Sequence, residues 1–209
     1  LKKPDWQNRL AQTDPASNEL TQVLVPISGA AVSLDYLEQF MHVLSRKNAR
    51  FHFYVVSREN MYTKPFLDRL AKKSYISLVT SKHDREVVTY YNKLVDSSVF
   101  AFELTKPSEQ AFKAILSSRR RGGMILLFMQ PVGRQEKDNL AFLARHNLIG
   151  IHGFELPHGT LASAKFVLDN LKSGFFLSSL KKRVDKSGNE DELSSHGAAQ
   201  FWQELTKHL

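Results

Sequence analysis

Short apolar runs alternate with amphipathic segments along most of the chain. The run "TQVLVPI" at 21–27 is typical of a buried strand, and the three- and four-residue apolar spacing over 33–48 predicts a helix capped by Ser33. The same patterns predict strands at 50–56, 75–80, 97–104, 123–128 and 148–154, and helices at 63–73, 85–95, 107–118, 134–147 and 161–174. Strands separated by helices pair in parallel through right-handed crossovers. We therefore predict a doubly wound, mostly parallel, Rossmann-like α/β sheet of about six strands.

Both ends of the chain differ in composition from this alternating part. Residues 1–20 are polar and include two prolines, which indicates an extended lead-in to one Rossmann-like domain at 21–175. Residues 176–209 are predicted to form a charged tail that closes with a C-terminal helix. In that helix Phe201, Trp202 and Leu205 are expected to pack back onto the domain.

Several classes of protein are disfavoured by the composition. The chain of 209 residues has no cysteine, and its eight histidines show no metal-binding spacing, so we expect no metal site. No apolar run reaches the roughly 18 residues of a membrane span, and no signal-peptide pattern opens the chain. We therefore expect a cytoplasmic protein, with peripheral contact to a membrane left open.

The formal charge of +8 suggests an anionic partner such as a nucleotide, a nucleic acid or an acidic membrane surface. The chain lacks the interleaved basic and aromatic motifs of common RNA-binding modules, so no specific nucleic acid is expected. Arg119–Arg121 precede a predicted strand, at the end of the sheet away from a ligand crevice. These arginines could instead meet anionic lipid or another subunit.

Candidate ligand contacts lie in the loops that follow the strands, because open parallel sheets bind ligands at the carboxyl ends of their strands. In "PISGAAVS", Gly29 would let the backbone approach a phosphate, and the alternative is an ordinary tight turn. The segment lacks the second and third glycines of the dinucleotide fingerprint. A nicotinamide dehydrogenase is therefore disfavoured, and no cofactor is expected.

Two further loops carry polar groups at the start of a helix. Glu109 follows Pro107 and would either interact with the helix dipole alone or accept the hydroxyls of a ribose. The loop "QPVGRQEKDN" offers donors and acceptors together, as sugars require, from Gln130, Arg134, Gln135, Glu136 and Asn139. The alternative is a helix start that is merely rich in polar residues.

The stretch "LVTSKHDREVVTYYNKLVDSSVFAFELTKPSEQAFKAI" followed by "ILLFMQPVGRQEKDN" resembles the carboxy-terminal half of GT-B glycosyltransferases. The likeness is greatest to the transferase that adds N-acetylglucosamine to the peptidoglycan lipid precursor, and to its relatives that glycosylate diacylglycerol. It runs from about Val23 to Leu171, and its most specific part is R-Q-x-x-x-N at Arg134, Gln135 and Asn139.

The resemblance implies a role for each candidate residue. Ser28 and Gly29 would approach the diphosphate, Thr80 and Ser81 in "VTSK" would lie against uracil, and Glu109 would bind the ribose. Gln135 and Glu136 would hold the hydroxyls of the sugar, with Asn139 supporting their helix.

The implied function is binding of a UDP-sugar donor in an inverting transfer of a hexose or N-acetylhexosamine to a lipid or saccharide acceptor. The acceptor would bind to an amino-terminal half or to a partner subunit, so these residues would not be active in isolation. The first loop has fewer glycines than in active members of the family. A non-catalytic binding module or pseudo-glycosyltransferase subunit of the same fold is therefore the alternative.

Overall fold

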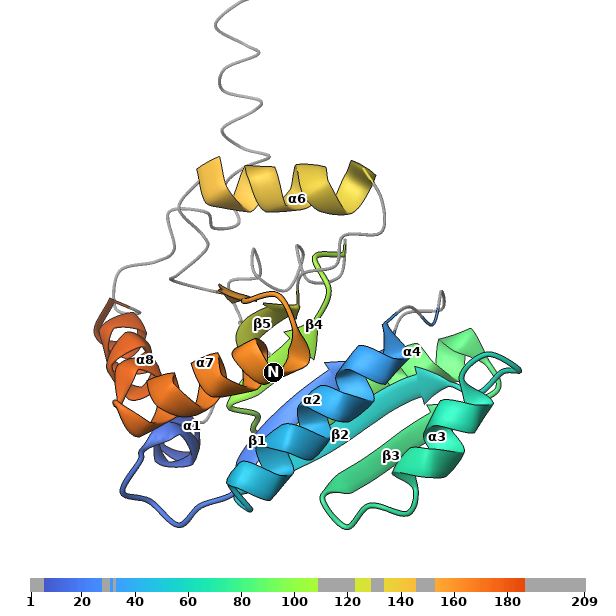
Figure 1. Ribbon diagram of the computed structural model, residues 1–209, viewed down its shortest axis with the longest axis horizontal. Helices are drawn as coiled ribbons and strands as arrows, with labels where there is room; N and C mark the ends of the chain where they lie inside the picture. Colours follow the sequence, from blue (N-terminus) through green and yellow to red (C-terminus); the bar gives the residue numbers. More distant parts are fainter. Residues whose placement is uncertain are drawn as a thin grey trace, which may run out of the picture.

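The computed structural model describes residues 6–27, 31, 33–108, 123–128, 134–145 and 153–186 (Figure 1). Its strands are β1 (Thr21–Pro26), β2 (Phe51–Arg58), β3 (Ile76–Ser81), β4 (Phe102–Thr105), β5 (Met124–Phe128) and β6 (Gly153–Leu156). Its helices are α1 (Trp6–Thr13), α2 (Leu34–Lys47), α3 (Lys64–Leu70), α4 (Asp84–Ser97), α6 (Arg134–Arg145), α7 (Thr160–Lys172) and α8 (Phe175–Lys186). All strand pairs are parallel, in the order β3-β2-β1-β4-β5-β6. The predicted Rossmann-like α/β fold is therefore confirmed.

Two predicted strands differ in their bounds from the observed ones. The apolar pattern placed the fourth strand at 97–104, whereas β4 spans Phe102–Thr105. It placed the sixth at 148–154, of which 148–152 lie outside the described residues, and β6 continues to Leu156. A segment forms a strand only where a neighbouring strand provides backbone hydrogen-bond partners. The pairing of β4 with β1 begins at Phe102, which lies opposite Val23. The helix predicted at 107–118 has only its first two residues within the described part of the chain.

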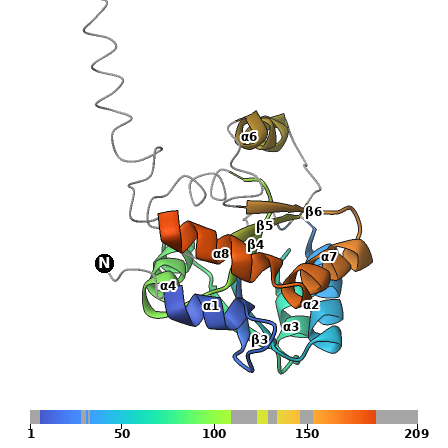
Figure 2. The same cartoon turned by 90° about the vertical axis from the view of Figure 1, so that its left-hand side faces the viewer.

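The sheet is covered on both faces, as its continuous apolar strands require. One face carries the larger core, in which side chains of α2, α3, α7 and α8 pack against the strands. The opposite face carries α4, whose apolar side chains pack on Leu24, Val56 and Phe100. Figures 1 and 2 show α2 and α4 on these two faces. None of the described helices is long and apolar enough to cross a membrane.

The amino-terminal segment contains a helix and is not simply extended. The prediction of an extended lead-in was wrong for α1, which contacts α8 and buries the side chain of Gln12. The side-chain amide of Gln12 donates a hydrogen bond to the backbone carbonyl of Val99 at 2.9 Å. Its oxygen accepts one from the backbone N–H of Gln22 at 3.1 Å. A helix of eight residues is marginal by itself, so these tertiary contacts stabilise it.

The start of the predicted tail is part of the core. Phe176 and Leu180 of α8 are fully buried, and the Phe176 ring meets the Phe102 ring with centroids 4.9 Å apart. Phe176 and Leu180 thus belong to the core of the sheet domain. The predicted C-terminal helix around Trp202 lies outside the described residues.

Candidate functional site

The order of the strands defines one switch point, between β1 and β4. From β1 the chain proceeds outward to β2 and β3, then returns to β4 beside β1 and continues outward to β5 and β6. The loops that follow β1 and β4 therefore begin next to each other, at the point where the order of the strands reverses. In open α/β sheets a crevice forms between such loops, and ligands bind there.

The loop after β1 leads into α2 through unusual backbone conformations. Ala31 and Ser33 have φ values of 49° and 63°, in the left-handed region that few non-glycine residues adopt. Ser33 occupies the N-cap position, as predicted, but its hydroxyl makes no capping hydrogen bond. Its left-handed φ differs from the extended conformation usual at an N-cap. The predicted phosphate contacts Ser28 and Gly29 lie outside the described residues.

The loop after β4 is bound to α6 by two polar contacts. The Lys106 ammonium lies 2.6 Å from the Glu136 carboxylate, and the two side chains are only 16% and 11% exposed. In the next turn of α6, the Asn139 amide donates to the Pro107 carbonyl at 3.3 Å. Both views place α6 beyond the carboxyl ends of β4 and β5 (Figures 1 and 2). These contacts therefore hold the start of α6 at the switch point.

The four candidate residues of α6 divide into two pairs. Glu136 and Asn139 face the loop after β4, where they make the contacts described above. Arg134 and Gln135 are exposed, and Arg134 lies 3.6 Å from Asp138 one turn along the helix. An exposed pair of this spacing contributes about 0.3–0.5 kcal/mol, so it constrains Arg134 weakly. Glu109, the predicted ribose carboxylate, lies outside the described residues.

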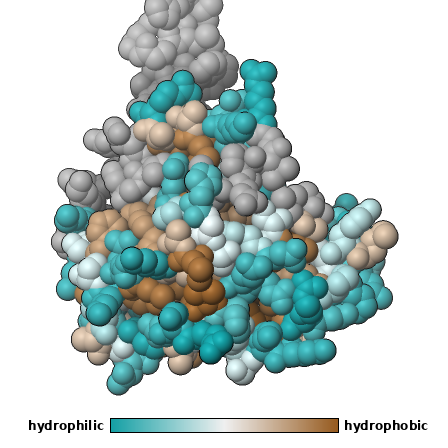
Figure 3. Space-filling model, in the orientation of Figure 1, coloured by the Kyte–Doolittle hydropathy of each residue, from teal (hydrophilic) through white to brown (hydrophobic). Residues whose placement is uncertain are grey.

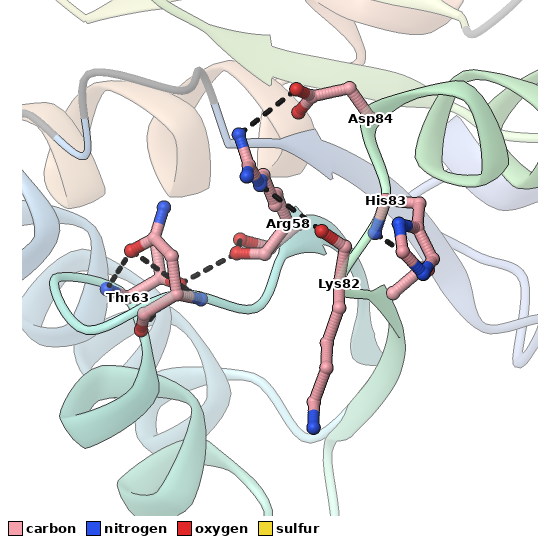
Figure 4. Close-up of polar contacts among 8 residues, drawn as sticks. Arg58, Thr63, Lys82, His83 and Asp84 are labelled. Carbon is pink, nitrogen blue, oxygen red and sulfur yellow. Dashed lines mark hydrogen bonds and ion pairs between the residues drawn. The ribbon is translucent and has the colours of Figure 1, made fainter.

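The turn after β3 is held by local contacts. The Ser81 hydroxyl accepts a hydrogen bond from the His83 amide at 3.1 Å and donates to the Glu86 carboxylate. Arg58, the last residue of β2, pairs with Asp84 at 2.9 Å and donates to the Lys82 carbonyl at 3.2 Å (Figure 4). These bonds order the start of α4 without a ligand.

The structure does not bring the predicted uracil contacts next to the predicted sugar contacts. Thr80 and Ser81 end β3, which is separated from β4 by β2 and β1. With neighbouring strands about 4.8 Å apart, the ends of β3 and β4 are about 14 Å apart. One ligand would need to reach across β2 and β1 to contact both groups.

Lys106 is the residue of this region to which the sequence analysis gave no role. It directly follows a buried strand on the ligand side and precedes a proline. A cation at that position is the signal that could have identified it. Only the structure pairs it with Glu136, because 30 residues of chain separate the two.

An open pocket of about 660 Å³ lies beside the switch point, between the starts of α2, α3 and α7. Its lining is largely polar and includes Ser33, Tyr36, Gln39, Tyr62, Arg69 and Thr160. Arg69 is already paired with Glu38 at 2.8 Å, and the Tyr36 hydroxyl donates to Ser163 at 2.8 Å. Figure 3 shows apolar and hydrophilic side chains interspersed on this face. Among the described residues, no group of three or more histidine or acidic side chains could hold a metal ion.

Comparison with known proteins shows a likeness at the level of the fold. No family model matches the sequence, and no curated protein matches it. Among solved structures, the chain is similar to TarM, a glycosyltransferase of the GT-B type, with a TM-score of 0.52 and 12% identity. The match covers 92% of this chain and 36% of the TarM chain. The chain thus has a glycosyltransferase-like fold and spans about a third of the length of TarM.

Proposed function

We propose that this chain is the donor-binding part of a GT-B glycosyltransferase and binds a UDP-sugar at the carboxyl ends of its strands. The observation that carries the proposal is the likeness to TarM over 92% of the chain. The polar residues of α6 at the switch point support it, because carboxylate and amide groups suit sugar hydroxyls. The motif of Arg134, Gln135 and Asn139, together with the resemblance of the sequence, favours UDP as the nucleotide.

Within this proposal the complete enzyme transfers a hexose or N-acetylhexosamine to a lipid or saccharide acceptor with inversion. The acceptor is held by a second half, in the same polypeptide or in a partner subunit. Such a half would place the acceptor hydroxyl in line with the anomeric carbon, which alone can lower a barrier by about 7–11 kcal/mol. The part described here would bind the diphosphate and the donor sugar, at a membrane surface if the acceptor is a lipid.

UDP is expected to raise the thermal midpoint of the chain. A ligand at 100 times its dissociation constant adds about 2.7 kcal/mol, which corresponds to roughly 5–10 °C for a chain of this size. Differential scanning fluorimetry with UDP, UDP-glucose and UDP-N-acetylglucosamine measures the shift, and GDP at the same concentration controls for the diphosphate. The absence of a shift with all three uridine ligands at millimolar concentration would contradict the proposal.

Gln135→Ala is expected to weaken binding of a UDP-sugar but not of UDP. Gln135 is exposed in the first turn of α6, and in the proposal its amide contacts only the sugar. Loss of one neutral hydrogen bond of about 0.5–1.5 kcal/mol corresponds to a weakening of about two- to twelvefold. Isothermal titration calorimetry with both ligands measures the difference, and Arg145→Ala at the exposed far end of α6 is the control. Equal weakening of both ligands would remove Gln135 from the sugar site.

The second candidate is a non-catalytic module with the same fold. It is favoured by the contact between Lys106 and Glu136, because the Glu136 carboxylate, which is expected to bind sugar hydroxyls, is already paired with Lys106. A module of this kind would keep the sheet without binding a nucleotide. It therefore predicts no thermal shift in the fluorimetry experiment, whereas the donor-binding proposal predicts one.

A further inference from the structure

One side of α2 gives the open pocket between α2, α3 and α7 a polar floor. Asp35 and Gln39 are four residues apart, so both project from this side of the helix into the pocket. Each makes one long contact with a neighbouring helix. Asp35 lies 3.5 Å from Arg69 of α3, and the Thr160 hydroxyl of α7 donates to the Gln39 amide oxygen at 3.4 Å. Contacts of this length at the surface are weak, so these groups can exchange them for hydrogen bonds to a ligand.

The ring of Tyr62 forms one wall of the pocket, and its loop is held in place by side chains. The Asn60 side-chain oxygen accepts hydrogen bonds from the backbone N–H groups of Tyr62 and Thr63, at 2.8 and 3.0 Å. The buried Thr63 hydroxyl donates to the backbone carbonyl of Arg58 at 2.6 Å (Figure 4). Tyr62 itself is 70% exposed, and its hydroxyl makes no hydrogen bond within the described part of the chain. An aromatic ring on an ordered loop is a preformed surface for an apolar face of a ligand.

The charges of the pocket do not suit an anionic ligand. Among the described residues that line it, only Asp35 and Arg69 are charged, and they compensate each other. Arg69 is also paired with Glu38 at 2.8 Å. A phosphate group in the pocket would be repelled by Asp35 and would compete with Glu38 for Arg69. The lining therefore favours a neutral ligand.

A pyranose sugar combines the properties that this lining requires. Its hydroxyls both donate and accept hydrogen bonds, as do the polar groups of Gln39 and Thr160, and they can also donate to the Asp35 carboxylate. Its apolar C–H face suits the exposed ring of Tyr62. The pocket volume of about 660 Å³ lies within the range of small-molecule sites, about 300–1,000 Å³.

We propose that this pocket binds a neutral saccharide, which stacks on the ring of Tyr62. Its hydroxyls contact the side chains of Asp35, Gln39 and Thr160 at the starts of α2 and α7. The inference goes beyond the proposed function, because it needs no nucleotide and uses none of the residues assigned to the donor.

The test is titration of N-acetylglucosamine, methyl glucoside and cellobiose into the parent chain, followed by NMR chemical shifts and saturation transfer. Tyr62→Ala is expected to weaken binding about tenfold, because it removes the stacking surface. Gln39→Ala is expected to weaken it about two- to twelvefold, as for one neutral hydrogen bond. The control is Tyr90→Ala, which removes an exposed tyrosine from α4 on the opposite face of the sheet and should change affinity by less than about twofold.

Tyr62→Phe separates stacking from a contact of the hydroxyl. It keeps the ring, so it is expected to retain the affinity of the parent to within about threefold. Thermal unfolding should show that both Tyr62 variants fold like the parent, because the residue is exposed. Equal weakening by Tyr62→Phe and Tyr62→Ala would overturn the stacking role.

Further outcomes separate this inference from the proposed function. It is wrong if none of the three saccharides binds at millimolar concentration, if Tyr62→Ala binds as well as the parent, or if inorganic phosphate displaces the saccharide. Displacement by UDP would place the saccharide in the donor site, so this inference would fail while the proposed function stands. If a saccharide binds through Tyr62 but UDP gives no thermal shift, this inference stands and the proposed function fails.

Discussion

Replacing Gly123 with alanine is expected to lower the free energy of unfolding by about 4 kcal/mol. This value combines the cost of backbone strain with the cost of steric overlap. Gly123 precedes β5 and has a φ of 98°, a conformation that residues with a Cβ rarely adopt. A Cβ at this position would lie 2.6 Å from the carbonyl carbon and oxygen of Ala101. Those atoms belong to the backbone and cannot rotate away, so β4 and β5 would have to separate.

Urea denaturation of the two proteins measures this effect, and Gly174→Ala provides a matched control. Gly174 also has a positive φ, of 74°, but nothing lies within 4 Å of the position of its added Cβ. Its substitution should therefore show the backbone strain alone, of about 1–3 kcal/mol. Equal losses at the two positions would mean that the close approach of Gly123 to Ala101 does not limit packing between the strands.

Glu103→Gln is expected to stabilise the protein at pH 8 by about 3 kcal/mol and to have little effect at pH 4. Glu103 is fully buried in β4, and burial raises the pKa of its carboxyl from 4.5 to about 7. The Tyr91 hydroxyl, 3.0 Å from one carboxylate oxygen, opposes this rise in pKa by donating a hydrogen bond. Glutamine has a similar shape, can accept the same hydrogen bond and carries no charge.

The sign of this pH dependence follows from the raised pKa. Below about pH 4.5 the carboxyl is protonated in both the folded and the unfolded chain, and its burial carries no charge penalty. As the pH rises from about 4.5 to about 7, only the folded chain keeps the proton, so stability is lost over this range. The difference in unfolding free energy between parent and variant isolates the contribution of Glu103 from that of other carboxylates.

Denaturation series at pH 4, 6 and 8 test the prediction. Glu155→Gln on β6 is the control, because Glu155 is exposed and its substitution should change stability by less than about 0.5 kcal/mol at each pH. A difference between the parent and Glu103→Gln that stays constant with pH would contradict a raised pKa for Glu103.

The fold class and most of the secondary structure could be predicted from local patterns along the chain. Apolar runs such as 21–27 and the helical spacing over 33–48 are local patterns, and β1 and α2 form within two residues of the predicted bounds. Alternation of strand and helix also implied parallel pairing, because consecutive parallel strands need a crossover.

Which polar groups contact one another could not be predicted in this way. The contacts of Lys106 with Glu136 and of Gln12 with Val99 join residues that are distant in the sequence, and no local pattern specifies them. The short helix α1 and the boundary of β4 likewise depend on their partners, α8 and β1. The spacing of apolar residues along a helix or strand indicates which of its sides is buried. The pairing of charged side chains depends instead on how the helices and strands pack in space.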